Sequence, residues 1–344
     1  MGLQLSPIRH WLQHRQLQRL IRSYQVRSVR LEASSKCQLK CPLCITGVGT
    51  TRQKEHPVGW GHLSFENFER FLALNPTIKR LELSNYGEVV LNPDLPRILA
   101  LARELKVKVY IKNGLNLNHL SEEMAEALVR YRVRGIKVSI DGASQQTYAQ
   151  YRVGGNLEQV LANIRTINAY KAQYQSPYPA LKWQFIAFGH NEHELPLARQ
   201  MAAELGMAFK VKLNYQPEQF PVQNPDFVAE QSGLGVADVR SYEQRHRRVY
   251  SPACLQLWTA PQVNWDGKLL GCCVNHFDDF GNAFEVPLAQ LLQSERYQYA
   301  KAMLLNQAPA REDIPCTACK RYPRVRQMPF YQELNEALQS QKTR

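Results

Sequence analysis

The sequence has no long uncharged apolar run and no secretory signal. Its apolar stretches never approach the roughly 18–20 uncharged residues that a membrane-spanning helix requires. Near the N-terminus, arginines interrupt the apolar positions and no small-residue cleavage site follows. We therefore expect no transmembrane segment and a cytoplasmic protein. In a reducing compartment, clustered cysteines indicate metal binding or catalysis rather than disulfides.

Acidic residues are scarce relative to basic ones. The 344 residues include 30 Asp and Glu against 43 Lys and Arg, a net charge of +13. This excess favours anionic partners such as a phosphorylated substrate, nucleic acid or a membrane surface. Arginines among helically spaced apolar residues precede the first acidic residue, Glu32, and predict a basic helix over residues 1–24. Such a helix either packs on the protein with its basic face in water or lies on a membrane.

Strand-like and helical patterns alternate through the first two thirds of the chain. The strand-like runs are rich in Val, Ile, Leu and aromatic residues, and this alternation is typical of a parallel sheet with crossover helices. The predicted strands are Val26–Ala33, Ile78–Ser84, Lys106–Lys112, Gly135–Ile140, Leu181–Phe188 and Phe209–Leu213. The predicted helices are Ser64–Ala73, Pro93–Leu105, Ser121–Tyr131, Leu157–Ala172 and His193–Leu205.

Six such strands predict an α/β fold, a partial (β/α)6 TIM-like barrel over residues 25–215 that stays open. In barrels of this kind the chemistry lies at the C-terminal ends of the strands. Prolines and glycines then indicate a linker over 216–249. A small second domain follows at 250–330, with a tail at 331–344. We expect this domain to have short strands at Gln262–Asn264 and Leu269–Cys272 and a helix over Leu288–Leu305.

The first cysteine group has the spacing CxxxCxxC and directly follows the first strand. Cys37, Cys41 and Cys44 would supply three thiolates to a 4Fe-4S cluster and leave one iron without a protein ligand. An open coordination position suits a catalytic metal centre, and S-adenosylmethionine (SAM) can chelate that iron. The alternatives are a zinc site with a distant fourth ligand and a chance cluster. Zinc motifs usually contain a second Cys pair downstream, so a lone triplet fits a zinc site poorly.

With this triplet, four further motifs make the chain resemble the radical SAM superfamily over nearly its whole length. Tyr86-Gly87-Glu88, after the second strand, is similar to the family's Gly-Gly-Glu motif, with Tyr86 in place of the first glycine. Asn113-Gly114 follows the third strand, as in the family's Thr-Asn-Gly. Ser139-Ile-Asp141-Gly142 ends the fourth strand, and Tyr148–Gly155 resembles the segment that carries a SAM-binding arginine, here Arg152.

The resemblance implies a SAM site assembled from several strand ends. Glu88 would contact the SAM ammonium, Arg152 would pair with the SAM carboxylate, and Ser139 would contact the carboxylate or the ribose. A zwitterionic ligand needs one anion and one cation in this way, and a guanidinium is well shaped for a carboxylate. The expected SAM-binding residues are Gly87, Glu88, Asn113, Ser139, Asp141, Arg152 and Asn191.

The second cysteine group supplies four thiols within about 65 residues, Cys254, Cys272, Cys316 and Cys319. Four thiolates can close a site around zinc or around an iron–sulfur cluster. The segment 266–272 resembles the hairpin that carries a cluster cysteine in SPASM and twitch extensions of radical SAM enzymes. This resemblance implies one auxiliary 4Fe-4S cluster, with Cys272 rather than Cys273 as ligand, and zinc is the alternative.

These features predict an enzyme that reductively cleaves SAM to methionine and a 5′-deoxyadenosyl radical. The radical would abstract hydrogen from a substrate C–H bond, and the auxiliary cluster would accept an electron from the substrate or help to position it. We expect a flavodoxin- or ferredoxin-type electron donor. The substrate is a peptide, as for many SPASM relatives, or a small polar metabolite such as a sugar, aminocyclitol or nucleotide.

A competing hypothesis is a non-enzymatic protein that binds metal or nucleic acid, with zinc at the C-terminal cysteines. The basic charge and the Cys pairs agree with it, but the open triplet, Glu88 and Arg152 do not, so we expect no nucleic-acid partner. The sequence identifies no general acid or base. His190 and His193 follow the fifth strand, where a single histidine is more often a hydrogen-bonded surface residue.

Overall fold

Seven parallel strands form the central sheet of the computed structural model, which describes residues 26–329, 331, 332 and 335. The predicted helix at 1–24 and most of the predicted tail lie outside these residues. The strand order is β6-β5-β4-β3-β2-β1-β7, and the two edge strands do not pair, so the barrel is open as predicted. The strands are β1 Ser28–Leu31, β2 Arg80–Glu82, β3 Lys108–Leu115, β4 Gly135–Ser139, β5 Ala180–Ile186, β6 Ala208–Lys212 and β7 Gln262–Val263.

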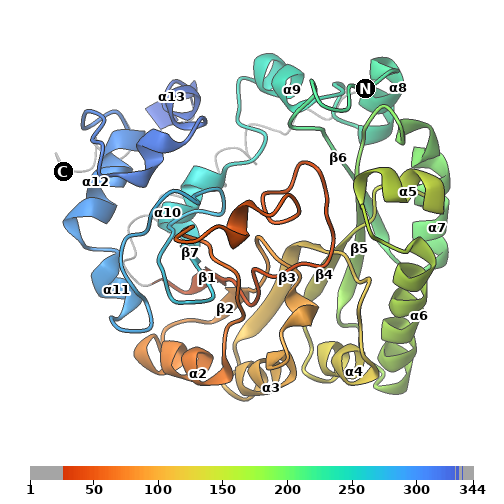
Figure 1. Ribbon diagram of the computed structural model, residues 1–344, viewed down its shortest axis with the longest axis horizontal. Coiled ribbons are helices and arrows are strands. Elements are labelled where there is room, and N and C mark those ends of the chain that lie inside the picture. Colours follow the sequence, from red (N-terminus) through yellow and green to blue (C-terminus); the bar gives the residue numbers. More distant parts are fainter. Residues whose placement is uncertain (1–25, 330, 333–334, 336–344) are drawn as a thin grey trace, which may run out of the picture.

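The helices of the barrel cover the convex side of the sheet, while the segment after β1 crosses its open side (Figure 1). All five predicted helices are present, and α5 is additional. Ser64 and Ser121 cap their helices, because their hydroxyls accept hydrogen bonds from the amides of Asn67 and Met124. The helices are α2 Phe65–Leu74, α3 Leu95–Glu104, α4 Glu122–Arg130, α5 Gln145–Tyr151, α6 Leu157–Gln173 and α7 Leu195–Glu204.

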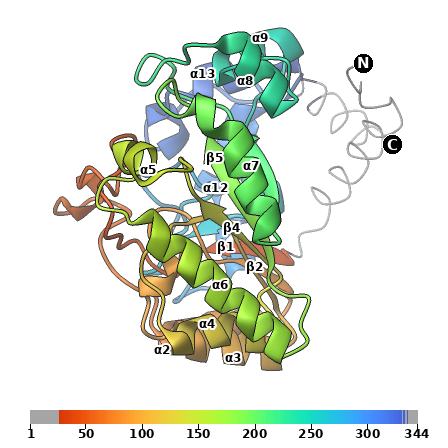
Figure 2. The same ribbon diagram turned by 90° about the vertical axis from the view of Figure 1, so that its right-hand side faces the viewer.

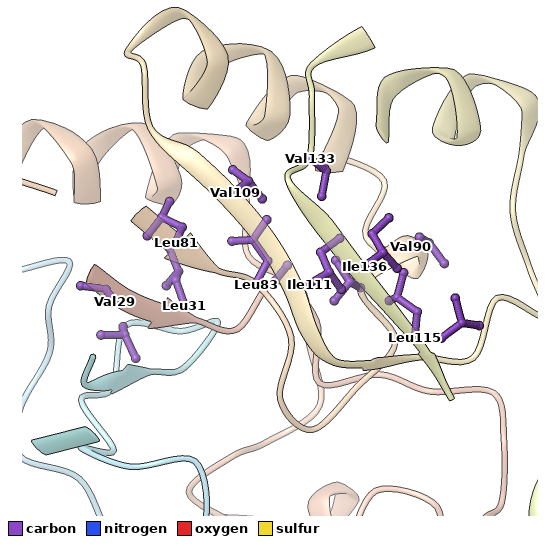
Figure 3. Packing of buried hydrophobic residues seen from close by; sticks show 14 of the residues in the cluster. Val29, Leu31, Leu81, Leu83, Val90, Val109, Ile111, Leu115, Val133 and Ile136 are labelled. Carbon is purple, nitrogen blue, oxygen red and sulfur yellow. The ribbon is translucent and has the colours of Figure 1, made fainter. Parts of the chain in front are cut away.

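The core fills the layer between the sheet and these helices. Leu81, Val109 and Ile136 of three successive strands are buried in one cluster with apolar side chains of α2, α3 and α4 (Figure 3). Each fully buried aliphatic side chain contributes roughly 1.5–3 kcal/mol to folding. Because side chains alternate along a strand, every second residue points away from this core into the open interior of the barrel.

The segment expected to be a linker contains two helices, α8 Pro225–Ser232 and α9 Val239–His246. The prolines that suggested a linker fit this arrangement, because Pro225 occupies the first turn of α8 and Gly233 caps its end in the left-handed conformation. Asn224 accepts a hydrogen bond from the amide of Phe227 and starts the helix. Figure 2 shows α8 and α9 together at one end of the molecule, above α7.

The C-terminal region differs from its prediction in two places. The expected helix over Leu288–Leu305 is two helices, because Ser294 starts a new one by accepting from the amide of Tyr297. The expected strand at Leu269–Cys272 is reduced to isolated antiparallel bridges, one of them between Val263 and Leu269. The remaining helices are α10 Gln256–Thr259, α11 Leu288–Leu291, α12 Glu295–Leu304 and α13 Tyr322–Val325, and the 3-10 helices are Thr50–Arg52, Val89–Leu91, Glu192–Glu194, Ala253–Leu255 and Pro315–Ala318.

Strand β7 joins the C-terminal region to the barrel. It pairs in parallel with β1, so that Arg30 lies beside Gln262 and Leu31 beside Val263. The amide of Arg30 donates to the carbonyl of Pro261 at 3.0 Å, and the side chain of Arg30 reaches Gln262. No helix in the described part of the chain has the length and apolar character needed to cross a bilayer.

Candidate cofactor site at the strand ends

The three cysteines of the first group line one cleft at the C-terminal ends of the strands. The cleft has an empty volume of about 790 Å³, open solvent at its mouth included. Five of the seven predicted SAM-binding residues line it as well: Gly87, Glu88, Asn113, Ser139 and Arg152. Residues from loops more than 100 positions apart therefore meet where the parallel strands end, as expected for a barrel of this type.

The cysteine loop is folded tightly against an apolar wall. The amide of Cys44 donates to the carbonyl of Cys41 at 3.1 Å, which closes a turn between them. Gly47 lies so close to this turn that a Cβ atom would be 2.5 Å from the Cys41 carbonyl oxygen, so only glycine fits there. Cys41 is buried in a cluster with Tyr151 and Ile186, and this cluster fixes the direction of the thiols.

Burial controls the chemistry of these thiols. It raises the pKa of Cys37 to about 12, and the nearby Glu88, Cys41 and Cys44 add to the shift. Burial also raises the pKa of Cys41, while Arg152 opposes the shift from 3.8 Å. The protonated thiols are therefore favoured in the absence of metal, and an electropositive metal centre is what would hold them as thiolates.

Gly87 and Glu88 connect the loop after β2 to the cysteine loop. A Cβ atom at Gly87 would be 2.2 Å from the carbonyl oxygen of Ser34, so the glycine permits a close backbone approach. This approach lets the Glu88 amide donate to the Lys36 carbonyl at 2.7 Å. The buried Glu88 carboxylate accepts from the amides of Asn116 and Leu117, at 2.8 and 3.3 Å. Its predicted contact with SAM stays a prediction, and its visible task is to fix the end of β3.

A second carboxylate, Glu32, holds the same loop from beneath. It is fully buried, and its oxygens accept from the amides of Asn85, Tyr86 and Gly87 at 2.9–3.3 Å. Burial raises the pKa of Glu32 to about 7, although these amides oppose the shift. This role of Glu32 was not identified from the sequence, where the available signal was a carboxylate directly after a buried strand.

Replacing Glu32 with alanine should therefore weaken folding strongly. Three backbone amides would lose their acceptor in a buried site, which costs about 1–3 kcal/mol for each group left unsatisfied. Urea unfolding should show a loss of at least about 3 kcal/mol. Glu69→Ala, at an exposed position of α2, is the control and should change stability by less than about 0.5 kcal/mol. Equal stability of the two variants would contradict this role of Glu32.

Arg152 and Asp141 form a buried ion pair beside the cysteines. The guanidinium contacts Asp141 Oδ2 through Nε at 2.7 Å and through Nη2 at 2.6 Å. Asp141 is fully buried, and its other oxygen accepts from the Ile186 amide at 2.6 Å. Asp141 does not line the cleft itself but orients Arg152, whose Nη1 faces Cys41. The pair thus joins the loops after β4 and β5 to the cysteine loop.

Asn113, Ser139 and Asn191 differ in their placement. Strand β3 continues past Lys112 to Leu115 with a register irregularity, and Asn113 is exposed at the cleft. Ser139 also lines the cleft, next to Gly114. Asn191 is fully buried outside the lining, and both of its amide hydrogens are used, by the carbonyls of Asp141 and Ile186. The expected role of Asn191 in SAM binding stays a prediction, and in this placement its side chain stabilises the turn after β5.

The second cysteine group lines a separate cavity with an empty volume of about 410 Å³. The cavity wall includes all four predicted ligands, Cys254, Cys272, Cys316 and Cys319, amid largely apolar side chains. Burial raises the pKa of Cys254 and of Cys316 to about 12. Cys273 is outside the lining, and its sulfur accepts from Gln256 Nε2 at 3.3 Å. The four thiols converge as the sequence predicted, and the choice of Cys272 over Cys273 agrees with this arrangement.

Comparison with known proteins identifies two domains, and each of them contains one of the cysteine groups. Residues 31–177 match the family model of the radical SAM superfamily, and residues 254–320 match that of the SPASM iron–sulfur cluster-binding domain. The chain therefore carries a radical SAM domain followed by a SPASM domain. The radical SAM domain implies SAM and a 4Fe-4S cluster, and the SPASM domain implies auxiliary iron–sulfur clusters.

Relatives within the radical SAM superfamily differ in function. A probable GTP 3′,8-cyclase of Methanococcus maripaludis is 27% identical over 192 residues, which is 54% of this chain and 58% of the relative. The chain thus spans little more than half the length of the curated relatives it matches. A solved structure of Streptococcus suis SuiB bound to its precursor peptide SuiA superposes with a TM-score of 0.60 at 14% identity, covering 91% of this chain and 74% of that one. The structure of anSMEcpe with bound AdoMet gives 0.53 at 14% identity, covering 87% and 88%. These two likenesses show the fold.

The radical SAM cleft fits a cluster with one open iron. Its described lining offers the three thiols but no fourth cysteine and no histidine. Among the described residues, no group of His, Cys, Asp or Glu converges on a point that could hold a single metal ion. A structural zinc site is closed by four ligands, so the three thiols of this cleft suit a cluster with one open iron better than zinc.

The loop after β2 also connects the two sites. The connection depends on Tyr86, which replaces the first glycine of the family motif. Tyr86 lines the radical SAM cleft, and its hydroxyl donates to the carbonyl of Asn275 at 2.8 Å. Asn275 lines the auxiliary cavity. Asn85 adds a bond from its Nδ2 to the carbonyl of Cys273 at 3.2 Å. A glycine in place of Tyr86 would remove this connection.

Other cleft residues were not identified from the sequence. Asn116 donates through Nδ2 to the Cys37 sulfur at 3.6 Å and accepts at Oδ1 from Gln38. Gln184 of β5 and Lys212 of β6 also line the cleft. Their signal was a polar residue that alternates with apolar residues in a predicted strand, which indicates a side chain facing the open interior.

Proposed function

We propose that this enzyme reductively cleaves SAM and removes a hydrogen atom from a C–H bond of a substrate held in the open barrel. The observation that carries this proposal is the convergence of Cys37, Cys41 and Cys44 with the Arg152–Asp141 pair in one cleft. When bound, a 4Fe-4S cluster supplies the electron that breaks the SAM carbon–sulfur bond and yields methionine and a 5′-deoxyadenosyl radical.

The chain's own residues bind and orient the reactants. Arg152 presents a guanidinium that Asp141 keeps fixed, and this guanidinium would hold the SAM carboxylate next to the cysteine loop. Ser139 and Asn113 offer polar groups on the same lining for the rest of SAM. Tyr151 and Ile186 form an apolar wall beside the thiols, which limits the access of water to a reactive radical.

SAM cleavage tests this proposal directly. With dithionite as reductant, the anaerobically reconstituted enzyme should form 5′-deoxyadenosine, and the Cys37/Cys41/Cys44 triple Ala variant should form none above background. Iron analysis of the same preparations should show about eight irons in the parent and about four in the variant. Glu69→Ala serves as a folded control with parental activity. Continued SAM cleavage by the triple variant would reject the proposal.

We further propose an oxidative outcome for the substrate. When bound in the second cavity by Cys254, Cys272, Cys316 and Cys319, a cluster supplies an electron acceptor beside the cleft. The hydrogen bond from Tyr86 to Asn275 connects the two sites through one loop. We propose a flavodoxin- or ferredoxin-type donor and a reducing compartment, which suits a chain whose eight cysteines are all free thiols.

Two substrate classes agree with the comparisons. SuiB was solved with a precursor peptide, and the relatives from Methanococcus maripaludis are named as probable GTP cyclases. A peptide and a small polar metabolite are therefore both proposed.

A further inference from the structure

The open interior of the barrel carries a layer of lysines directly beneath the SAM cleft. Ser139, Gln184 and Lys212 line the cleft from β4, β5 and β6. Side chains two residues apart on a strand point to the same face, about 6.6–7 Å from each other. The residues two positions earlier on these strands are Lys137, Lys182 and Lys210. Lys137 and Lys182 therefore face the same interior one layer deeper than the cleft residues, and Lys210 faces it at the level of Gln184.

Strand register brings these lysines close together. Lys137 of β4 lies directly opposite Lys182 of β5, and Lys210 of β6 lies opposite Gln184. Neighbouring strands are about 4.8 Å apart, so the amines share one small region. Lys112 of β3 alternates with the buried Ile111 and thus faces the same interior. We call Lys112, Lys137, Lys182, Lys210 and Lys212 the lysine layer.

The amines of the lysine layer repel one another. Burial, together with Lys210 and Lys212, lowers the pKa of Lys137 to about 8. Burial also lowers the pKa of Lys112, with Arg80 and Lys182 contributing to the shift. The charges therefore meet in a partly desolvated space, where like charges are costly.

The described part of the chain supplies little counter-charge. None of the five amines takes part in an ion pair within the described residues. Glu82 is the nearby carboxylate and partly offsets the lowered pKa of Lys137 and of Lys112, but its single charge faces five amines. Asp141 is neutralised by Arg152. The first 31 residues contain no acidic side chain that could supply the missing charge.

A parallel sheet normally has apolar side chains on both faces. Five half-buried or exposed lysines on the inner face lower the stability of the empty protein, and an anionic ligand would reverse that effect. Lys212 belongs both to the lysine layer and to the cleft, so one molecule can reach from the lysines to the SAM site.

We propose that the lysine layer binds the phosphate groups of the substrate, which is a small molecule carrying two or more adjacent phosphates. The phosphates would lie among Lys137, Lys182 and Lys210, and the carbon to be attacked would reach the cleft one layer above. This inference rests on the proposed function only for the part of the substrate from which hydrogen is removed. The phosphate site itself depends on the lysines alone, and it favours the small metabolite over the peptide.

Equilibrium binding tests the site. Isothermal titration of the anaerobically reconstituted enzyme with inorganic triphosphate should show binding that weakens as ionic strength rises. Lys137→Gln/Lys182→Gln should weaken it about 10- to 100-fold, because two charge-assisted hydrogen bonds are lost. Lys54→Gln/Lys79→Gln removes the same charge from exposed positions and should bind as the parent does. Lys137→Arg/Lys182→Arg should keep most of the affinity, which excludes misfolding as the cause.

SAM cleavage of each variant separates this inference from the proposed function. The Gln variant should still form 5′-deoxyadenosine without substrate, since neither lysine lines the cleft. If Lys137→Gln/Lys182→Gln bound triphosphate as tightly as the parent, the phosphate site would be overturned. An equal loss of affinity in Lys137→Gln/Lys182→Gln and in Lys54→Gln/Lys79→Gln would also overturn it. Tighter lysine-dependent binding of an acidic peptide than of triphosphate would also overturn it. A parent that binds triphosphate through these lysines but never cleaves SAM would reject the proposed function and leave the site standing.

Discussion

Replacing Cys272 with alanine should remove about four of the roughly eight irons of the reconstituted enzyme, whereas Cys273→Ala should remove none. The two thiols are adjacent in the chain but point to different places. Cys272 lines the auxiliary cavity with Cys254, Cys316 and Cys319, and Cys273 is held outside it by Gln256. A cluster that needs four thiolates has no substitute for Cys272 in that lining.

Iron and sulfide analysis with EPR on matched preparations measures this difference. The EPR signal that SAM perturbs should persist in both variants, because the first cysteine group is untouched. Cys273→Ala is a closely matched control, since it removes the same atoms one residue away. Loss of four irons from Cys273→Ala and none from Cys272→Ala would show that the assignment of ligands is inverted. If the parent contained one zinc and four irons, the second cysteine group would be a zinc site and not an auxiliary cluster site.

Arg152→Met should abolish SAM binding and also destabilise the protein by about 3–5 kcal/mol. The substitution leaves the Asp141 carboxylate buried, fully inaccessible and without its cation. A buried charge that loses its partner is far more costly than the pair is stabilising. Arg165→Met, at an exposed position of α6, is the control and should change neither property.

A second substitution distinguishes the two tasks of Arg152. Asp141→Asn/Arg152→Met removes the unpaired charge but keeps an oxygen for the Ile186 amide, so stability should recover by at least about 2 kcal/mol. SAM binding should still be lost, because no cation faces the SAM carboxylate. Urea unfolding and equilibrium dialysis with SAM measure the two effects. Parental SAM affinity in the double variant would show that Arg152 only holds the loops together.

The barrel could be predicted because its signals are local. Five of the six predicted strands are apolar runs before a helical pattern, and all six are found with ends that differ by a few residues. Strand β7 is only Gln262–Val263, and its partner β1 is more than 200 residues away, so no local signal indicates the pairing. Helix α8 was missed because Pro225 at its start and Gly233 at its end look like linker residues, and α9, which Asp238 caps, was missed with it.

The sequence predicted those site residues whose type alone indicates a function, such as a metal-binding cysteine. It did not predict the residues whose function depends on contacts that form only in the folded structure. The cysteines and Arg152 are of the first kind, and the structure brings them together. Glu32 holds the loop after β2 because three backbone amides of that loop donate hydrogen bonds to its carboxylate. Asn191 was predicted to bind SAM, but its side-chain amide already donates hydrogen bonds to backbone carbonyls. The alternation of lysines in three strands was present in the sequence, but its meaning depends on which face is open.

The pairing of β7 with β1 makes the two halves of the protein depend on each other during folding. A chain that ended before residue 250 would keep all six barrel strands, yet the edge of β1 would lose its neighbour. The Arg30 and Glu32 amides, which donate to Pro261 and Val263, would then be available to another molecule. Exposed strand edges of this kind promote intermolecular pairing. During synthesis, the sheet is therefore completed only when β7 has been made. We expect a chain that lacks β7 to aggregate rather than to persist as an isolated barrel.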